Sequence, residues 1–122
     1  MRLQAYFQIE KGSFLMLKIT DNDGFQFDEK RFTKIDLIKT KNTNVFMLNF
    51  LPNQEMKQHA HPGKDLSLHV LHGSGTLFID DEKFDIKAGD IIYCEAHEEV
   101  GFINNETDKT SIYGVLSRVP TE

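Results

Sequence analysis

The stretch His59-Ala60-His61-Pro62-Gly63 decides how the rest of the chain is interpreted, because its residue types require a chemical explanation. On a β-strand successive side chains alternate between faces, so His59 and His61 point the same way. Two imidazoles on one face form a candidate metal-binding pair. Pro62 and Gly63 then favour a turn, and residues 66–72 follow as an apolar-rich run. We therefore expect a β-hairpin with the histidine pair near its rim.

Outward from this stretch, short apolar-rich segments alternate with turn residues such as Asp21-Asn22-Asp23-Gly24. The other expected strands are residues 3–9, 14–19, 35–38, 44–51, 54–61, 76–79, 83–86, 91–94, 100–103 and 110–118. Segment 25–34 stays open, because its aromatic residues are spread among charges and a short helical turn fits it as well. Many short strands with frequent turns indicate an all-β sandwich or barrel, and the pattern alone does not choose between them.

The length of 122 residues predicts one domain, spanning residues 1–122. The single cysteine, Cys94, excludes an intrachain disulfide and fits a reducing compartment. No apolar run approaches the ~18 residues of a membrane span, and Lys11 and Lys18 enclose the longest N-terminal run, which speaks against a signal peptide. We expect a cytoplasmic protein. Its net charge of -5 disfavours nucleic acid and anionic membranes as partners.

The histidine stretch resembles the first sequence motif of the cupin superfamily, which runs Gly, five residues, His, one, His, three or four, Glu, six, Gly. His59, His61 and Gly73 stand in register with it. Gly89 and Asn104 fit the second motif, which runs Gly, five residues, Pro, one, Gly, two, His, three, Asn. The resemblance covers about residues 44–118 and implies a double-stranded β-helix, or jelly-roll barrel. The N-terminal strands expected from the residue pattern lie before it, within about residues 1–40. The resemblance also implies a divalent metal held by both histidines of the first motif, its glutamate and the histidine of the second.

Half of that ligand set is missing, because Leu66 stands at the glutamate position and Val100 at the histidine position of the second motif. Neither side chain offers a lone pair, and both make the cavity more apolar, which raises the cost of holding a cation there. Asn53 replaces the first glycine of motif one, a mild change because asparagine tolerates left-handed backbone. Glu95 and His97 replace the proline and glycine of motif two, so this loop should have its own conformation.

Two neighbouring residues are candidates to replace the missing ligands. Asp65 follows His61 at the shorter spacing that the resemblance allows, and His97 lies three residues before Val100. A rebuilt site of His59, His61, Asp65 and His97 would suit zinc, iron, manganese or nickel. The alternative is that Asp65 is a solvated turn residue and His97 a rim residue.

Two classes of function remain, and whether the protein is an enzyme stays open between them. We favour a cupin that binds a small molecule in its barrel without a tightly held metal, with a lumen lined by Leu66, Leu68, Val70, Val100, Phe102 and Asn104. The alternative is a metal-dependent enzyme of the dioxygenase or isomerase type that uses His59 and His61 with Asp65, His97 or both. Cys94 is interpreted as a buried structural thiol, because nothing in the sequence provides a base beside it.

The N-terminal strands, at about residues 3–19, contain mixed apolar and polar residues. Exposed strand edges need covering, and pairing across a two-fold axis is one way to cover them. We therefore expect a homodimer in which this segment packs against the partner or exchanges with it.

Overall fold

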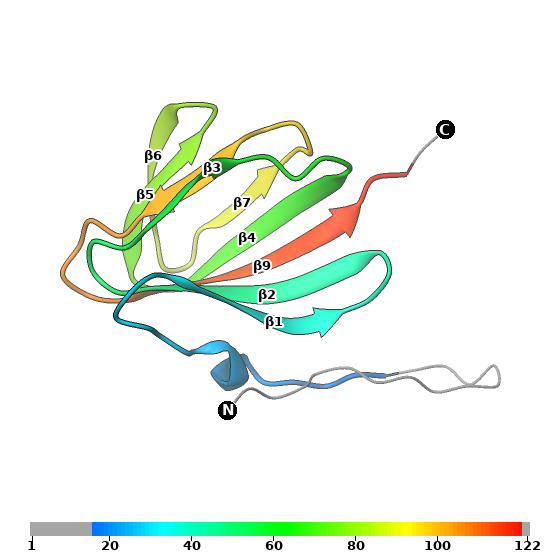
Figure 1. Ribbon diagram of the computed structural model, residues 1–122, viewed down its shortest axis with the longest axis horizontal. Helices are drawn as coiled ribbons and strands as arrows, with labels where there is room; N and C mark the ends of the chain where they lie inside the picture. The colour runs from blue at the N-terminus through cyan, green and yellow to red at the C-terminus, as the bar shows by residue number, and fades with distance from the viewer. Residues whose placement is uncertain (1–15, 121–122) are drawn as a thin grey trace.

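The computed structural model describes residues 16–120, which form nine β-strands and one short 3-10 helix (Figure 1). The elements run in the order η1 (Asp21–Gly24), β1 (Thr33–Lys39), β2 (Thr43–Phe50), β3 (Glu55–His59), β4 (Lys64–His72), β5 (Ser74–Ile79), β6 (Glu82–Lys87), β7 (Ile91–Cys94), β8 (Val100–Ile103) and β9 (Thr110–Arg118). From β1 onward these bounds agree with the expected strands to within two residues at each end. The all-β prediction is confirmed. Within residues 16–120 no helix has the length and hydropathy that a bilayer crossing requires.

The segments before β1 differ from the expectation. Residues 21–24 form η1, and the open segment 25–34 is mostly irregular, with an isolated bridge between Asp28 and Arg31 before β1 begins. Residues 16–19 of the expected strand 14–19 have no strand structure. The expected strand 3–9 and most of the segment predicted to form a dimer lie outside the described residues.

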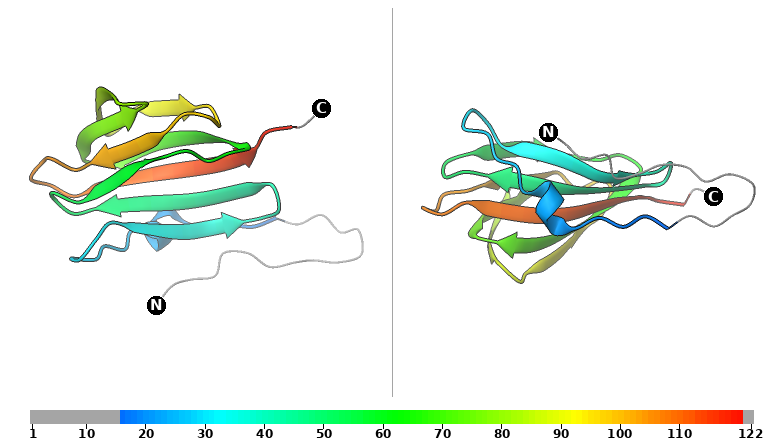
Figure 2. Two further views of the ribbon diagram at one scale, coloured as in Figure 1. Left: turned by 45° about the horizontal axis from the view of Figure 1, so that its top comes forward. Right: turned by 90° about the horizontal axis from the view of Figure 1, so that it is seen from below.

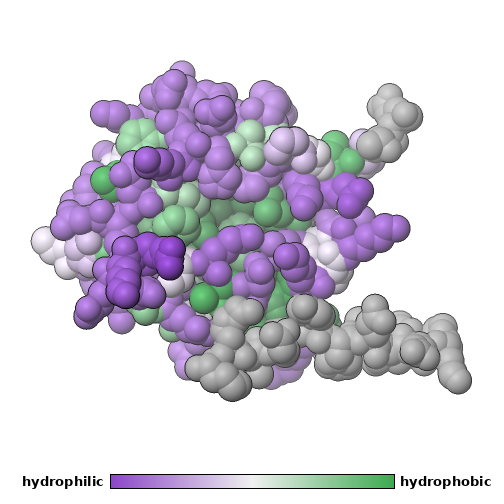
Figure 3. All heavy atoms as spheres, in the orientation of Figure 1, coloured by the Kyte–Doolittle hydropathy of each residue, from purple (hydrophilic) through white to green (hydrophobic). Residues whose placement is uncertain are grey.

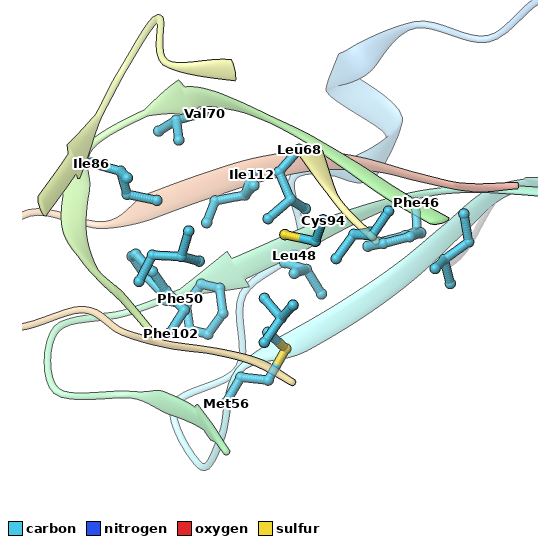
Figure 4. Packing of buried hydrophobic residues seen from close by; sticks show 14 residues of the cluster. Phe46, Leu48, Phe50, Met56, Leu68, Val70, Ile86, Cys94, Phe102 and Ile112 are labelled. Atoms are coloured by element: carbon cyan, nitrogen blue, oxygen red, sulfur yellow. The ribbon is translucent and has the colours of Figure 1, made fainter. Parts of the chain in front are cut away.

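The strands form two antiparallel sheets that face each other in a jelly roll (Figure 2). One sheet has the order β1-β2-β9-β4-β7 and the other β3-β8-β5-β6. Their inner faces enclose the main core, in which the rings of Phe50 and Phe102 lie 4.8 Å apart, centroid to centroid (Figure 4). The buried members of this core are Phe46, Leu48, Phe50, Met56, Leu66, Leu68, Val70, Leu77, Ile86, Cys94, Val100, Phe102, Ile112 and Leu116.

The expected hairpin between the strands on either side of Pro62-Gly63 is wrong. β3 pairs with β8, whereas β4 lies between β9 and β7 in the other sheet. The turn itself forms, because the Lys64 amide donates to the His61 carbonyl at 3.0 Å. The Val119 amide donates to the Gly63 carbonyl at 2.8 Å, which holds the turn beside the end of β9. The chain thus crosses between sheets here, and His61 lies at the crossing.

The outer face of the five-stranded sheet carries a second, smaller core of Ile35, Leu37 and Met47, with Ile19 and Phe25 packed on it. Helix η1 lies over this face (Figure 2, right). The fully buried Asn49 side chain donates to the Gly24 carbonyl at 2.7 Å and so fixes this segment to β2. Because β2 is covered on both faces, it is a nearly continuous apolar run.

Two of the motif positions have a clear backbone reason. Asn53 has a φ of 73°, so the expectation that asparagine accepts left-handed geometry in place of glycine is confirmed. Gly73 has a φ of 83°, and a Cβ there would lie 2.3 Å from the Lys109 carbonyl oxygen. Glycine is therefore favoured at position 73 both by the left-handed backbone and by the close approach of Lys109.

Candidate functional site

The structure brings His59 and His61 together. Their ring centroids are 4.7 Å apart with an edge-to-face angle of 64°, and both rings line the same pocket. His59 Nδ1 lies 2.9 Å from the Lys57 carbonyl oxygen, which can only accept, so Nδ1 donates the hydrogen bond. Burial lowers the pKa of His61, and the positive charges of His59, Lys34 and Lys64 lower it further. A pKa below its ordinary value keeps His61 mainly neutral at pH 7, so its imidazole can donate one hydrogen bond and accept another.

An irregularity in β3 determines which residues join the pair. Met56 pairs with Phe102 of β8 and His59 pairs with Val100, so one more residue separates the two positions on β3 than on β8. Strict alternation places Met56 and His59 on opposite faces, but this bulge turns both into the same pocket.

The pocket has a volume of about 100 Å³ and lies between the histidines and the inner face of the five-stranded sheet. Leu66 and Leu68, two of the residues proposed from the sequence for the cavity, line it. Where Figure 1 draws β4 and β9, hydrophobic side chains show between hydrophilic ones on the molecular surface (Figure 3). The full lining is Phe32, Lys34, Phe46, Leu48, Met56, His59, His61, Leu66 and Leu68.

Five lining residues were not anticipated from the sequence, and they are Phe32, Lys34, Phe46, Leu48 and Met56. Phe46 and Leu48 are two residues apart on β2 and therefore lie on the same face of the sheet. This spacing of apolar residues was visible in the sequence. Lys34 is the ladder partner of Leu48, so its side chain starts on the inner face, and its Nζ lies 4.9 Å from the centroid of the Phe46 ring. Phe32 precedes β1 in the segment whose structure the sequence left open.

The other expected cavity residues lie elsewhere in the core. Val70, Val100 and Phe102 are at most 1% exposed and do not line this pocket. The Asn104 side chain is also fully buried, and its amide group donates to the Phe50 and Asp108 carbonyl oxygens at 3.1 and 2.8 Å. Its Oδ1 accepts from the Glu106 amide at 3.0 Å. Asn104 thus fixes the loop between β8 and β9.

The structure does not bring Asp65 and His97 to the histidine pair. Asp65 and Leu66 are successive residues of β4, so with Leu66 inward the Asp65 side chain lies on the outer face, where it accepts a 2.6 Å hydrogen bond from the Tyr93 hydroxyl. The His97 side chain is 75% exposed, with Nδ1 3.7 Å from a Glu95 carboxylate oxygen. No strand shift of the kind that would turn Asp65 inward is present in the β4 ladders near it.

The described residues do not fit a tightly held metal. Among residues 16–120 no three His, Cys, Asp or Glu side chains are grouped as a metal would require. The buried side chains of Leu66 and Val100 lie beside the pair and provide no ligand atom. Lys34 adds an ammonium group to the same pocket, which repels a cation. Protein metal sites that perform catalysis usually keep three protein ligands, and this pocket offers two.

Cys94 is 1% exposed and belongs to the main core. Burial raises the pKa of its thiol to about 11, and the negative charge of Glu98 contributes to the rise. A thiol with this pKa stays protonated at neutral pH, which agrees with a structural residue.

Solved structures with the same fold are numerous. Protein TT1209 of Thermus thermophilus is 18% identical over 84% of this chain and 98% of its own, with a TM-score of 0.78. An uncharacterized protein with a double-stranded β-helix domain from Klebsiella pneumoniae is 18% identical over 89% of this chain and 91% of its own, with a TM-score of 0.77. A predicted oxalate decarboxylase of Thermotoga maritima is 18% identical over 70% of this chain and 79% of its own, with a TM-score of 0.67.

No curated protein sequence matches the chain. The family described as "Cupin domain", however, matches residues 46–116, which is more than half of the chain. This span runs from within β2 to within β9 and contains the histidine pair and both motifs. The protein belongs to the cupin family.

Proposed function

We propose that this cupin binds a small organic molecule at the pocket beneath His59 and His61, without a resident metal ion. The observation that carries the proposal is the composition of the pocket. Its wall is apolar except for two imidazoles and one ammonium group, and ligand sites combine an apolar wall with few polar groups in this way.

The pocket alone, at about 100 Å³, is smaller than most ligand sites, which enclose roughly 300–1,000 Å³. A second depression of about 260 Å³ shares Lys34 and His61 with it, so the two lie side by side. A ligand would therefore place its apolar part in the pocket and extend past His61 into the second space.

The alternative of a metal-dependent enzyme has less support. Asp65 and His97, which that function requires, lie away from the pair. The Thermotoga maritima structure is named as a predicted oxalate decarboxylase, but 18% identity carries only the fold to this chain.

The test is a thermal-shift screen of a metabolite library on the full chain, purified without an affinity tag and treated with a chelator. A ligand at about 100 times its Kd stabilises a protein by ~2.7 kcal/mol, which raises Tm by several degrees. We expect at least one compound to do so, and we expect its effect to be lost in His59→Ala and His61→Ala.

The matched control is His97→Ala, which removes an exposed imidazole outside the pocket. The ligand should stabilise this variant as well as the parent. The proposal fails if no compound stabilises the parent, if hits stabilise all variants equally, or if stabilisation requires added metal.

A further inference from the structure

The second depression, hereafter the lysine groove, differs in charge from the rest of the molecule. Four lysines line it and no Asp or Glu does, whereas the whole chain has a net charge of -5. Lys39 and Lys41 come from the end of β1 and the turn after it, and Lys64 is the first residue of β4. Lys34 stands at the boundary with the pocket beneath the histidines. Elements distant in sequence thus bring positive charge to the lysine groove.

One acidic residue opposes this charge and does not neutralise it. Asp36 lies on β1 between Lys34 and Lys39, with Nζ to carboxylate oxygen distances of 3.6 and 3.9 Å. A single carboxylate is therefore shared by two ammonium groups. Lys41 and Lys64 have no ion-pair partner among residues 16–120. The ladder partner of Lys64 is Arg118, a further cation on the neighbouring strand.

A buried amide in the same groove lacks a hydrogen-bond partner. The Asn44 side chain is 8% exposed and lines the groove, and its Oδ1 has no partner within the described part of the chain. Leaving such a group unpaired costs stability, so native proteins seldom do so without a reason. A ligand hydroxyl would satisfy the oxygen, and rotation of the amide would let its NH2 group donate to an anionic oxygen instead.

The lysine groove and the pocket together define the shape of an occupant. An apolar part fits the pocket between Phe46 and Leu66, and a charged part fits beside Lys41 and Lys64. Lys34 lines both spaces, and its Nζ lies 4.9 Å from the centroid of the Phe46 ring. Lysine provides a point charge suited to carboxylates and phosphates.

We propose that the ligand of this cupin is a small organic anion, whose carboxylate or phosphate lies in the lysine groove and whose apolar part lies beneath the histidine pair. The inference rests on the proposed function and specifies the class of its ligand. It also explains the absence of metal ligands, because the anion is held by lysines and needs no bridging cation.

The test uses two probes of equal shape, butanoate and butanamide, together with inorganic phosphate. Binding is followed by NMR through the backbone amide signals of Phe46 and Leu66 for the pocket and of Asn44 for the groove. At low salt we expect butanoate to bind about five- to tenfold more tightly than butanamide. Raising ionic strength from about 0.01 to 0.15 M shortens the Debye length from ~30 to ~8 Å. This change should weaken the binding of butanoate and leave the binding of butanamide unchanged.

The double variant Lys41→Gln/Lys64→Gln should bring butanoate to within about twofold of butanamide, because the two lysines without ion-pair partners are removed. The matched control is Lys83→Gln/Lys87→Gln, which removes two exposed charges from β6 in the other sheet and should keep the difference.

The outcomes separate this inference from the proposed function. If butanoate and butanamide bind the pocket equally well, the inference that the ligand is an anion is overturned, and the proposed binding function of the pocket stands. An equal loss of butanoate affinity in both double lysine variants also overturns the inference, because the affinity then depends on the total charge of the protein and not on the groove. If phosphate shifts the Asn44 signal while neither probe shifts the pocket signals, the pocket function falls and the inference that rests on it falls too, although the groove then still binds an anion. If none of the three compounds shifts any of these signals, both the inference and the proposed function are overturned.

Discussion

The Tyr93 hydroxyl donates a 2.6 Å hydrogen bond to Asp65 on the outer face of the five-stranded sheet. The bond joins the edge strand β7 to β4 and uses the carboxylate that would otherwise be a candidate metal ligand. It also raises the pKa of Tyr93 to about 12, because the donated proton would be lost next to a negative charge.

Replacing Asp65 with asparagine should therefore lower the pKa of Tyr93 toward its ordinary value of about 10. The measurement is the ultraviolet absorbance of tyrosinate during an alkaline titration, with Tyr93→Phe to identify which transition belongs to this residue. Ligand binding at the pocket should not change. An unaltered Tyr93 transition, or loss of ligand binding, would contradict the placement of Asp65.

Cys94 gives a prediction about alkaline stability. Its pKa rises from 9.0 to about 11 on folding, so between these values the unfolded chain has lost the thiol proton and the folded chain has kept it. The free energy of unfolding should then fall as pH rises through this window, by at most about 1.4 kcal/mol per pH unit from this group.

Urea unfolding at several pH values should show a shallower decline for Cys94→Ala than for the parent, although the variant is less stable throughout because it leaves a small cavity. Tyr93 titrates in an overlapping range and is present in both proteins, so the difference between slopes isolates the thiol. Equal slopes would contradict the prediction.

The strands could be predicted because each has a local pattern that its environment preserves. The nearly continuous apolar run along residues 45–50 and turn residues near Gly73 and Gly89 are visible without any partner strand. The histidine pair was found the same way, since one intervening residue places two side chains on one face.

Features that depend on a partner strand could not be predicted. The bulge that brings Met56 beside His59 exists only relative to β8. Pro62 and Gly63 indicate a reversal of the chain but not which sheet it joins, so β3 and β4 were wrongly paired. Lys34 appeared as one charge among several in a segment without clear periodicity, and only its pairing with Leu48 reveals that it starts on the inner face.

Gly114 provides a way to close the pocket without touching its polar groups. It is the ladder partner of Phe46, and a Cβ at Gly114 would lie 2.4 Å from Cζ of that ring. In Gly114→Ala the ring must move, and the pocket is the open space beside it. We expect a loss of about 1–3 kcal/mol in stability from overpacking and a weakened binding of butanoate.

Denaturant unfolding and the NMR titration check the two parts. Ser117→Ala, an exposed change on the same strand, should alter stability by no more than about 0.5 kcal/mol and leave binding intact. Unchanged butanoate binding in a folded Gly114→Ala protein would show that the ring does not border the ligand.

The absent metal ligands lead to the last prediction. Leu66 lines the pocket together with His59 and His61, and Val100 is the ladder partner of His59. The combined change Leu66→Glu/Val100→His should therefore place two ligand atoms within reach of the pair, at the ~2–2.5 Å that metal bonds require. Its affinity for zinc, nickel or manganese should rise well above that of the parent, and each single change should give less, because ligands of one ion act non-additively.

Calorimetric metal titration of the parent, both single variants and the double variant measures this, after circular dichroism has shown that each is folded. A buried glutamate without a metal lowers stability, so added metal should raise the Tm of the double variant more than that of the parent. If the parent already binds one metal tightly and the double variant gains nothing, groups other than Leu66 and Val100 complete the site. That result would favour the metal-dependent enzyme over the metal-free binding function.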